Sequence, residues 1–265
     1  MNSIRSICVI LLALLWAALL IPVHMISRIV FPNTRYLLPQ IFHKGLCKLL
    51  RVKLICHGTP SKTQPTLFVI NHISWLDIPV VGKALQGSFV AKEEVSKYPL
   101  FGLFAKLQET IFIARTRHSI KVHKTDMQEH LEKGDNMFLF PEGTSSNGLV
   151  IHNFKSAYFA LAENHAGDKA LCVQPVTLAY SKMDNMYVTR NIMKSIAWVG
   201  DEQLLGHIWE FLKSGHVTAE LRFHPPVTIE DYDSRKEMAA DCQLLIAEGL
   251  SRAMTNRAEP IVADN

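Results

Sequence analysis

The chain has 265 residues, of which 48% are hydrophobic, and its formal net charge is +4 at pH 7. This length can bury the core of one large or two small domains, and the apolar content is high for a purely soluble protein. The mild basic excess suits an anionic membrane surface or a phosphate-bearing substrate. No Lys and Arg run is interleaved with aromatic residues, so we predict no nucleic-acid partner. The five scattered cysteines lack metal spacing and indicate reduced, buried thiols.

The N-terminal segment is strongly apolar. Residues 7–23 carry no charge, which is about the minimum length that spans a bilayer as a helix. A cleaved signal peptide is the rival interpretation, because Arg5 supplies a short basic region before the apolar run. The run is long for that role and no clear A-x-A cleavage site follows it, so we favour an uncleaved anchor. Whether this helix crosses the bilayer or lies in one leaflet stays open.

Basic residues follow the apolar segment and predict its orientation. They outnumber the single Arg5 before it, so the positive-inside rule predicts that the bulk of the chain faces the cytoplasm. Residues 36–50 have the pattern of a basic amphipathic helix lying on the membrane, although an ordinary surface helix packed on the core fits equally well. We therefore divide the chain into a membrane-associated segment, residues 1–50, and an α/β domain, residues 51–265.

Beyond residue 51, short apolar runs alternate with helical patterns. Expected strands cover residues 52–56, 66–70, 87–91, 110–114, 136–140, 171–180 and 216–223. Expected helices cover residues 78–85, 100–107, 119–132, 154–163, 203–212 and 234–254. Several strand runs are apolar throughout, as in strands that helices cover on both faces. This order predicts an α/β fold with a largely parallel mixed sheet flanked by helices.

His72 follows one of these apolar runs, and Asp77 lies five positions later. Strand ends are where α/β folds place ligands, and the spacing suits a turn that leads into a helix. A carboxylate there can hold the imidazole in one tautomer, so that His72 is able to take a proton from a substrate hydroxyl. The structural alternative is a hydrogen-bonded core histidine, with Ser74 and Asp77 forming a capping box.

The second motif is F-P-E-G-T-S-S, residues 140–146, which also follows an apolar run. Gly143 permits unusual backbone dihedrals, and the exposed N–H groups and hydroxyls of such a loop can surround an anion. A strand-to-helix turn rich in cap-forming residues is the alternative.

Several basic residues also follow strands or open helices. Lys92, Arg115 and Arg117 follow expected strands, and Lys155 opens an expected helix, where a positive charge is unfavourable. Together they could hold a phosphate or a phosphopantetheine-bearing donor, although each alone is an ordinary solvated charge. No paired histidines of the H-E-x-x-H type are present, so we predict no metal site.

These motifs resemble those of the glycerolipid acyltransferase superfamily, which contains 1-acylglycerol-3-phosphate acyltransferase. Its N-H-x-x-x-x-D block matches residues 71–77, and its second block, which ends in an arginine, matches I-F-I-A-R at residues 111–115. Its third block matches F-P-E-G-T at residues 140–144, and V-Q-P-V at residues 173–176 resembles the fourth. Order and spacing agree over roughly residues 50–223.

The resemblance implies direct acyl transfer from acyl-CoA or acyl carrier protein to a lysolipid hydroxyl, with no cofactor beyond this donor. It makes His72 the general base and Asp77 its orienting partner. It also implies an α/β core tethered to the membrane by N-terminal helices. The residues that it assigns to acceptor binding are Arg115, Glu142, Gly143 and Thr144.

The chain departs from the family pattern at Ser145, where the third block usually has an arginine. This loss should weaken the binding of a phosphomonoester. Two segments, E-G-T-S-S-N-G at residues 142–148 and I-A-W-V-G-D at residues 196–201, resemble the bacterial branch of the family that includes lyso-ornithine lipid acyltransferases. Lysophosphatidic acid remains an acceptor if Arg115, Arg117 or Lys155 supplies the missing charge. We keep Ser145, Lys92 and Lys155 among the predicted substrate-binding residues.

The sequence therefore predicts an O-acyltransferase of the inner (cytoplasmic) membrane, with its catalytic domain facing the cytoplasm. The first interpretation is synthesis of phosphatidic acid from 1-acylglycerol 3-phosphate, and lyso-ornithine lipid acylation is the alternative. A catalytically inactive lipid-binding protein and an acyl hydrolase are the alternatives from other classes. Intact His72, Asp77 and Glu142 argue against the inactive protein.

Overall fold

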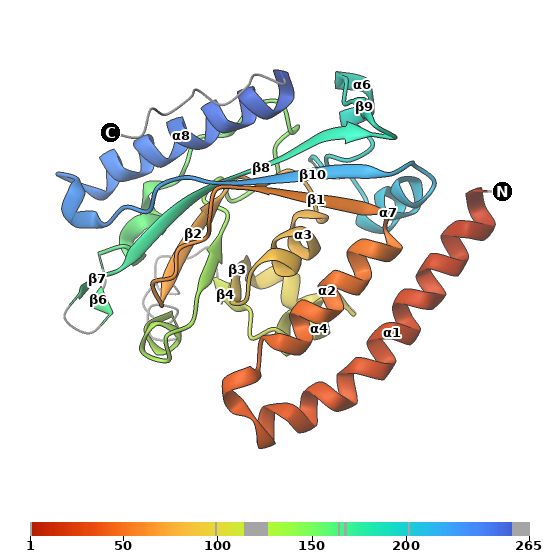
Figure 1. Ribbon diagram of the computed structural model, residues 1–265, viewed down its shortest axis with the longest axis horizontal. Coiled ribbons are helices and arrows are strands. Elements are labelled where there is room, and N and C mark those ends of the chain that lie inside the picture. The colour runs from red at the N-terminus through yellow and green to blue at the C-terminus, as the bar shows by residue number, and fades with distance from the viewer. Residues whose placement is uncertain are drawn as a thin grey trace.

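The computed structural model describes residues 2–98, 100–113, 127–163, 165–166, 169–200 and 202–255. The helices that it describes are α1 (Asn2–Val30), α2 (Leu37–Leu49), α3 (Asp77–Ala84), α4 (Phe101–Leu107), α6 (Arg190–Met193), α7 (Leu204–Leu212) and α8 (Arg235–Thr255) (Figure 1). The long strands are β1 (Val52–His57), β2 (Thr66–Ile70), β3 (Ser88–Lys92), β8 (Cys172–Met183) and β10 (Val217–Phe223). The short ones are β4 (Ile111–Ile113), β5 (Met137–Leu139), β6 (His165–Ala166), β7 (Lys169–Ala170) and β9 (Met186–Tyr187).

The main sheet confirms the expected mixed, largely parallel architecture. Its strands follow the order β1-β10-β8-β2-β5-β3-β4, and β9 pairs with β8 at one end. Along this order, β10 and β8 are antiparallel, whereas the other neighbours are parallel. The carboxyl ends of β2, β5, β3 and β4 therefore lie at one edge of the sheet, where ligands bind in open α/β sheets.

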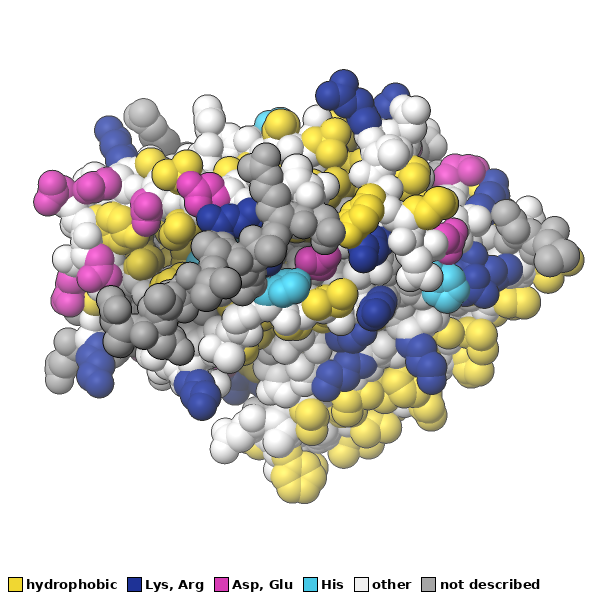
Figure 2. Space-filling model, turned by 45° about the horizontal axis from the view of Figure 1, so that its top comes forward, with side chains coloured by type: hydrophobic (Ala, Val, Ile, Leu, Met, Phe, Trp, Pro, Cys, Tyr) yellow, Lys and Arg dark blue, Asp and Glu magenta, His cyan; other side chains and the backbone are white. Residues whose placement is uncertain are grey.

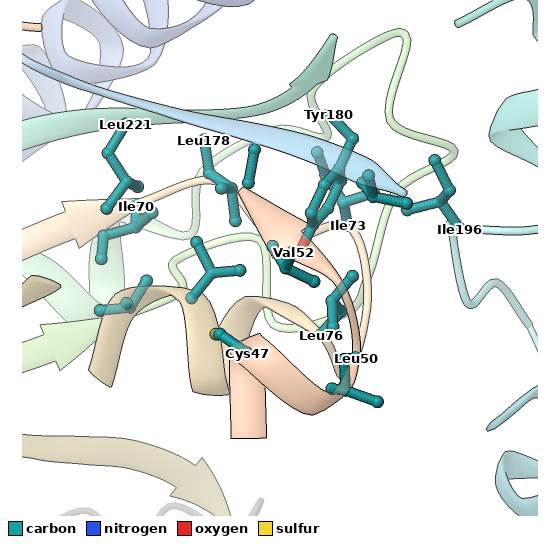
Figure 3. Close-up of a cluster of buried hydrophobic side chains, with 14 of the residues drawn as sticks. Cys47, Leu50, Val52, Ile70, Ile73, Leu76, Leu178, Tyr180, Ile196 and Leu221 are labelled. Atoms are coloured by element: carbon teal, nitrogen blue, oxygen red, sulfur yellow. The ribbon is translucent and has the colours of Figure 1, made fainter. Parts of the chain in front are cut away.

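Helices cover both faces of the sheet, which explains the continuous apolar strands (Figure 1). On one face α8 packs against β8 and contributes Met238, Cys242 and Ile246 to a buried cluster. On the other face the core includes residues of α2, α3 and α7. Figure 3 shows part of this second cluster, in which side chains from α2, from β1 and from the loop after β2 lie together beneath the sheet.

Helix α1 lies along the α/β domain rather than projecting from it (Figure 1). Near its start Arg5 donates to the carbonyl oxygen of Ser214 at 2.9 Å, and near its end His24 Nε2 lies 2.9 Å from the carbonyl oxygen of Leu107. At 1.5 Å per residue these two contacts are about 29 Å apart along the helix. Among the described residues, one helix, Ser3–Val30, has the length and hydropathy to cross a membrane.

The outer face of α1 is an exposed apolar surface. Its exposed large side chains include Leu11, Leu15, Leu19 and Ile26. Figure 2 shows apolar side chains gathered along the lower right edge of the molecule, with Lys and Arg side chains beside them. Such a surface is typical of a helix in contact with lipid. Helix α2 packs between α1 and α3, as the surface-helix alternative expected, while Lys44 and Lys48 stay exposed. The division into residues 1–50 and 51–265 stays a prediction.

The segment expected as a helix over residues 154–163 is instead a short 3-10 helix, Ser156–Leu161. Its preceding residue, Lys155, has an extended backbone, and the Lys155 N–H donates to the carbonyl oxygen of Pro141 at 3.0 Å. This bond ties the start of the segment to the loop after β5. Of the helix expected over residues 119–132, residues 127–132 are helical and the others lie outside the described residues. Other 3-10 turns cover Pro32–Thr34, Glu93–Lys97 and Ile229–Asp231.

Candidate active site

The site begins at the carboxyl end of β2, where Asn71 joins two strands. Its side-chain amide donates to the carbonyl oxygen of Leu178 at 2.9 Å and accepts from the Leu178 N–H at 2.7 Å. Asn71 is fully buried and Leu178 lies on the neighbouring strand β8. This two-way bond fixes the point at which the chain leaves the sheet and hence the position of the next residue, His72. The sequence offered no signal for this role.

His72 and Asp77 come together as the sequence predicted. His72 Nδ1 lies 2.7 Å from Asp77 Oδ2, and 20% of the His72 side chain is exposed whereas Asp77 is buried. A carboxylate only accepts, so Nδ1 carries the hydrogen and Nε2 of the neutral ring is left as an acceptor. The His72 ring also stacks on Phe140, with centroids 4.4 Å apart. The orientation of the His72 ring is thus fixed by the hydrogen bond to the Asp77 carboxylate and by the stacking on Phe140.

Asp77 is the first residue of α3 and accepts hydrogen bonds at both oxygens. Besides His72, its Oδ2 accepts from the backbone N–H groups of Ile73 at 2.6 Å and Ser74 at 3.0 Å. Its Oδ1 accepts from the Tyr180 hydroxyl at 2.7 Å. One carboxylate thus orders the loop and orients the imidazole. Only half of the predicted capping box forms, because the Ser74 N–H bonds to Asp77 whereas the buried Ser74 hydroxyl has no hydrogen-bond partner among the described residues. The catalytic role of the pair stays a prediction.

Tyr180 is a member of this site that sequence reasoning missed. It is fully buried on β8, and Figure 3 shows its ring in the core with the hydroxyl directed away from the sheet. Burial and the neighbouring Asp77 carboxylate hold the pKa of the Tyr180 hydroxyl well above its ordinary value. The hydroxyl therefore remains a donor to Asp77 throughout the physiological pH range.

Glu142 accepts hydrogen bonds from two backbone N–H groups. One of them belongs to the loop between β2 and α3, residues 71–76, which we call the catalytic loop. One of its oxygens accepts from the His72 N–H at 2.7 Å and the other from the His152 N–H at 2.7 Å. Burial raises the pKa of the Glu142 carboxyl to about 7, although these two N–H groups oppose the shift. Its predicted contact with the acceptor stays a prediction, and the geometry gives it a further task in positioning His72.

The rest of the loop turns at Gly143, whose φ of +66° favours glycine. A Cβ at this position would lie 2.7 Å from Lys155 Nζ, so the ammonium group sits directly against the turn. Thr144 is exposed, whereas Ser145 is only 8% exposed and its hydroxyl donates to the carbonyl oxygen of Trp198. The structure thus brings Gly143, Ser145 and Lys155 together near His72.

The remaining predicted substrate-binding residues are Lys92, Arg115 and Arg117. Lys92 ends β3 at the same edge of the sheet, two strands away from β2, and is half-buried. Arg115 and Arg117 lie outside the described residues, beyond the carboxyl end of β4. Their roles in binding substrate stay predictions.

Among the described residues, one group has ligand atoms close enough to hold a metal ion, and it lies at the opposite edge of the sheet from His72. It consists of Glu109, His130 and Asp135. Both of its carboxylates are already paired with the Arg35 guanidinium, and His130 Nδ1 lies 2.9 Å from Asp135 Oδ2. This arrangement is an ion-pair network that joins the α1–α2 connection to the α/β domain.

Comparisons with known proteins provide independent evidence on the family of this chain. A family model described as acyltransferase matches residues 53–195. A lyso-ornithine lipid O-acyltransferase of Brucella abortus is 36% identical over 227 residues, which cover 84% of this chain and 85% of that protein. One of Rhizobium meliloti is 30% identical over 261 residues, covering 97% of this chain and 88% of that protein.

Two further similarities concern a different acceptor. A 1-acyl-sn-glycerol-3-phosphate acyltransferase of Neisseria meningitidis is 37% identical over 119 residues, covering 44% of this chain and 46% of that protein. The crystal structure of a 1-acyl-sn-glycerophosphate acyltransferase from Thermotoga maritima has a TM-score of 0.68 at 19% identity, covering 98% of this chain and 100% of that one. The latter similarity establishes the fold.

Proposed function

The chain belongs to the acyltransferase family, and we propose that the acceptor of its lysolipid acyltransferase reaction is a lyso-ornithine lipid. The observation that carries the proposal is the side chain at position 145. It is a largely buried serine whose hydroxyl is used on the backbone of Trp198, so it offers no positive charge to a phosphomonoester. The two relatives that are similar over most of their length act on lyso-ornithine lipid by name.

The geometry supports His72 as the general base. Nε2 takes the proton of the acceptor hydroxyl while the hydroxyl oxygen attacks the thioester carbonyl carbon of the donor. The C–S bond then breaks, and the thiolate leaves with the proton that the imidazolium returns. Asp77 stabilises the imidazolium between these two proton transfers, as a carboxylate does beside a catalytic histidine. This route needs no covalent enzyme intermediate and no cofactor other than acyl-CoA or acyl carrier protein.

Lys155 is the described cation best placed to meet the acceptor headgroup. Its ammonium group lies against the Gly143 turn, in the loop that also carries Glu142. An ornithine headgroup carries a carboxylate, which one ammonium group can pair with. Thr144 and Lys92, together with Arg115 beyond β4, complete the proposed substrate contacts.

The protein associates with membranes through its apolar N-terminal helix, in keeping with its lipid substrates. We place it on the inner membrane with the catalytic domain in the cytoplasm, because basic residues follow α1 and an acyl thioester donor is cytoplasmic. The contacts of Arg5 and His24 with the α/β domain favour an α1 that lies in one leaflet, since both ends of the helix touch the same domain.

1-Acylglycerol 3-phosphate is the second candidate acceptor, favoured by Lys155 and by the similarity to the 1-acyl-sn-glycerol-3-phosphate acyltransferase of Neisseria meningitidis. The test is acyl transfer by protein reconstituted in vesicles, with labelled acyl-CoA or labelled acyl carrier protein and both acceptors present. Label in ornithine lipid supports the proposal, and label only in phosphatidic acid assigns the second candidate. Free fatty acid released without acceptor would indicate a hydrolase instead.

A further inference from the structure

Residues 196–200, which follow α6, lie beside the catalytic loop. Ile196 and Ala197 are buried in the same core cluster as Ile73 and Leu76, and Figure 3 shows Ile196 beside Ile73. The chain then rises to the surface, because Trp198 is half-buried and the residues after it are exposed. The segment is therefore anchored in the core at its start and exposed to solvent at its end.

The backbone of Trp198 is bonded on both sides to the catalytic motifs. Its N–H donates to the carbonyl oxygen of Ile73 at 3.0 Å, and its carbonyl oxygen accepts from the Ser145 hydroxyl. Ser146, which follows Ser145 in the chain, donates its N–H to the carbonyl oxygen of His72 at 2.8 Å. Three segments that are distant in sequence thus meet within one residue of the catalytic base. Ser145 is the side chain that closes this connection.

A second connection holds the same segment from the side of α7. The Trp75 indole N–H donates to His207 Nδ1 at 3.0 Å, and His207 Nε2 lies 3.1 Å from the carbonyl oxygen of Ala197. The two contacts fit a neutral imidazole with its hydrogen on Nε2, and burial lowers the pKa of His207, which keeps it neutral. Residues 196–200 are therefore held at a fixed distance from the loop that carries His72.

We propose that Ser145 is a positioning residue, whose hydroxyl fixes residues 196–200 as the wall of the acceptor site beside His72. The accessible part of this wall has no charged side chain, since it consists of the half-buried Trp198 and the exposed Val199 and Gly200. It suits an acceptor whose reacting hydroxyl is carried by an alkyl chain, because that chain can pack on the indole while the oxygen reaches His72. The inference rests on the proposed acyl transfer at His72 and concerns how the acceptor is selected there.

The test compares Michaelis constants for acceptor and donor in the reconstituted full chain. For Ser145→Ala we expect the acceptor KM to rise about tenfold, the size of one lost buried hydrogen bond, while the donor KM stays within about twofold. Ser145→Thr keeps a hydroxyl and restores the acceptor KM. Ser195→Ala is the matched control. The Ser195 hydroxyl donates to the carbonyl oxygen of Ile192 at 2.7 Å, so this variant loses a hydrogen bond of the same type, but one that lies within a single turn of the chain.

Trp198→Ala provides an independent variant, in case Ser145→Ala folds poorly. We expect it to raise the acceptor KM similarly, and the double variant to add little, because both changes act on one wall. An unchanged acceptor KM in folded Ser145→Ala, or an equal rise for donor and acceptor, overturns the inference while wild-type turnover leaves the proposed function intact. A wild-type protein that acylates neither acceptor overturns both.

Discussion

Replacement of Asp77 by Asn tests how the site activates His72. The amide can keep an oxygen towards the loop N–H groups of Ile73 and Ser74 and towards His72, and it can donate its NH₂ to the Tyr180 oxygen. The fold should therefore persist, whereas the negative charge beside the imidazole is lost. The variant isolates the electrostatic part of the Asp77 contribution.

The expected loss of rate follows from the distance between the Asp77 carboxylate and the positive charge that forms on the His72 ring. A unit charge pair about 4 Å apart interacts by about 4 kcal/mol at an effective dielectric constant of 20, which corresponds to about 10³-fold in rate. We expect kcat for Asp77→Asn to fall by about that factor, with little change in either KM. The assay is the initial rate of labelled acyl transfer in vesicles, with circular dichroism to confirm folding.

Asp231→Asn is the matched control, because Asp231 accepts from the Thr228 N–H and hydroxyl in an exposed turn. It should retain wild-type turnover. A folded Asp77→Asn protein with more than about half of the wild-type kcat would refute the assigned role of the carboxylate, and the imidazole would then need another source of stabilisation.

Three further predictions concern neighbours of this pair. Tyr180→Phe leaves Asp77 Oδ1 without its donor, so urea unfolding should show a loss of about 1–3 kcal/mol, and kcat should fall as well. Lys155→Ala should raise the acceptor KM about tenfold without affecting the donor KM, and Lys155→Arg should preserve it; equal KM values for Lys155→Ala and wild type would contradict the headgroup contact. Glu142 has a folded-state pKa of about 7, above its ordinary 4.5, so the folded protein binds more protons between these values. The free energy of unfolding should therefore decrease as the pH rises from about 4.5 to 7, and Glu142→Gln should lack this decrease in urea titrations.

The strands and the His72–Asp77 pair could be predicted because local sequence determines them. The apolar run 66–70 specifies a strand covered on both faces, and the spacing from His72 to Asp77 suits the turn observed between them. Partners supplied by distant strands could not be predicted. The contact of Tyr180 with Asp77 depends on the order of β8 and β2 in the sheet, and so does the bond between Asn71 and Leu178.

Position 145 illustrates the same limit. The sequence identified Ser145 as a departure from the family pattern, but it did not indicate that the hydroxyl would bond to Trp198. Similarly, the family resemblance implied that Glu142 binds the acceptor, and the structure adds hydrogen bonds to its carboxylate from the backbone N–H groups of His72 and His152. Both features depend on how loops from different parts of the chain meet, which residue spacing does not encode.

The central claim is that His72 is the base for direct acyl transfer to a lyso-ornithine lipid. The most direct measurement is the rate of labelled ornithine lipid formation by wild type and by His72→Ala, in vesicles and with folding verified. The account predicts rapid formation by wild type and a loss of at least about 10³-fold in the variant. Undiminished formation by a folded His72→Ala protein would contradict the mechanism, and labelled phosphatidic acid alone from wild type would contradict the acceptor.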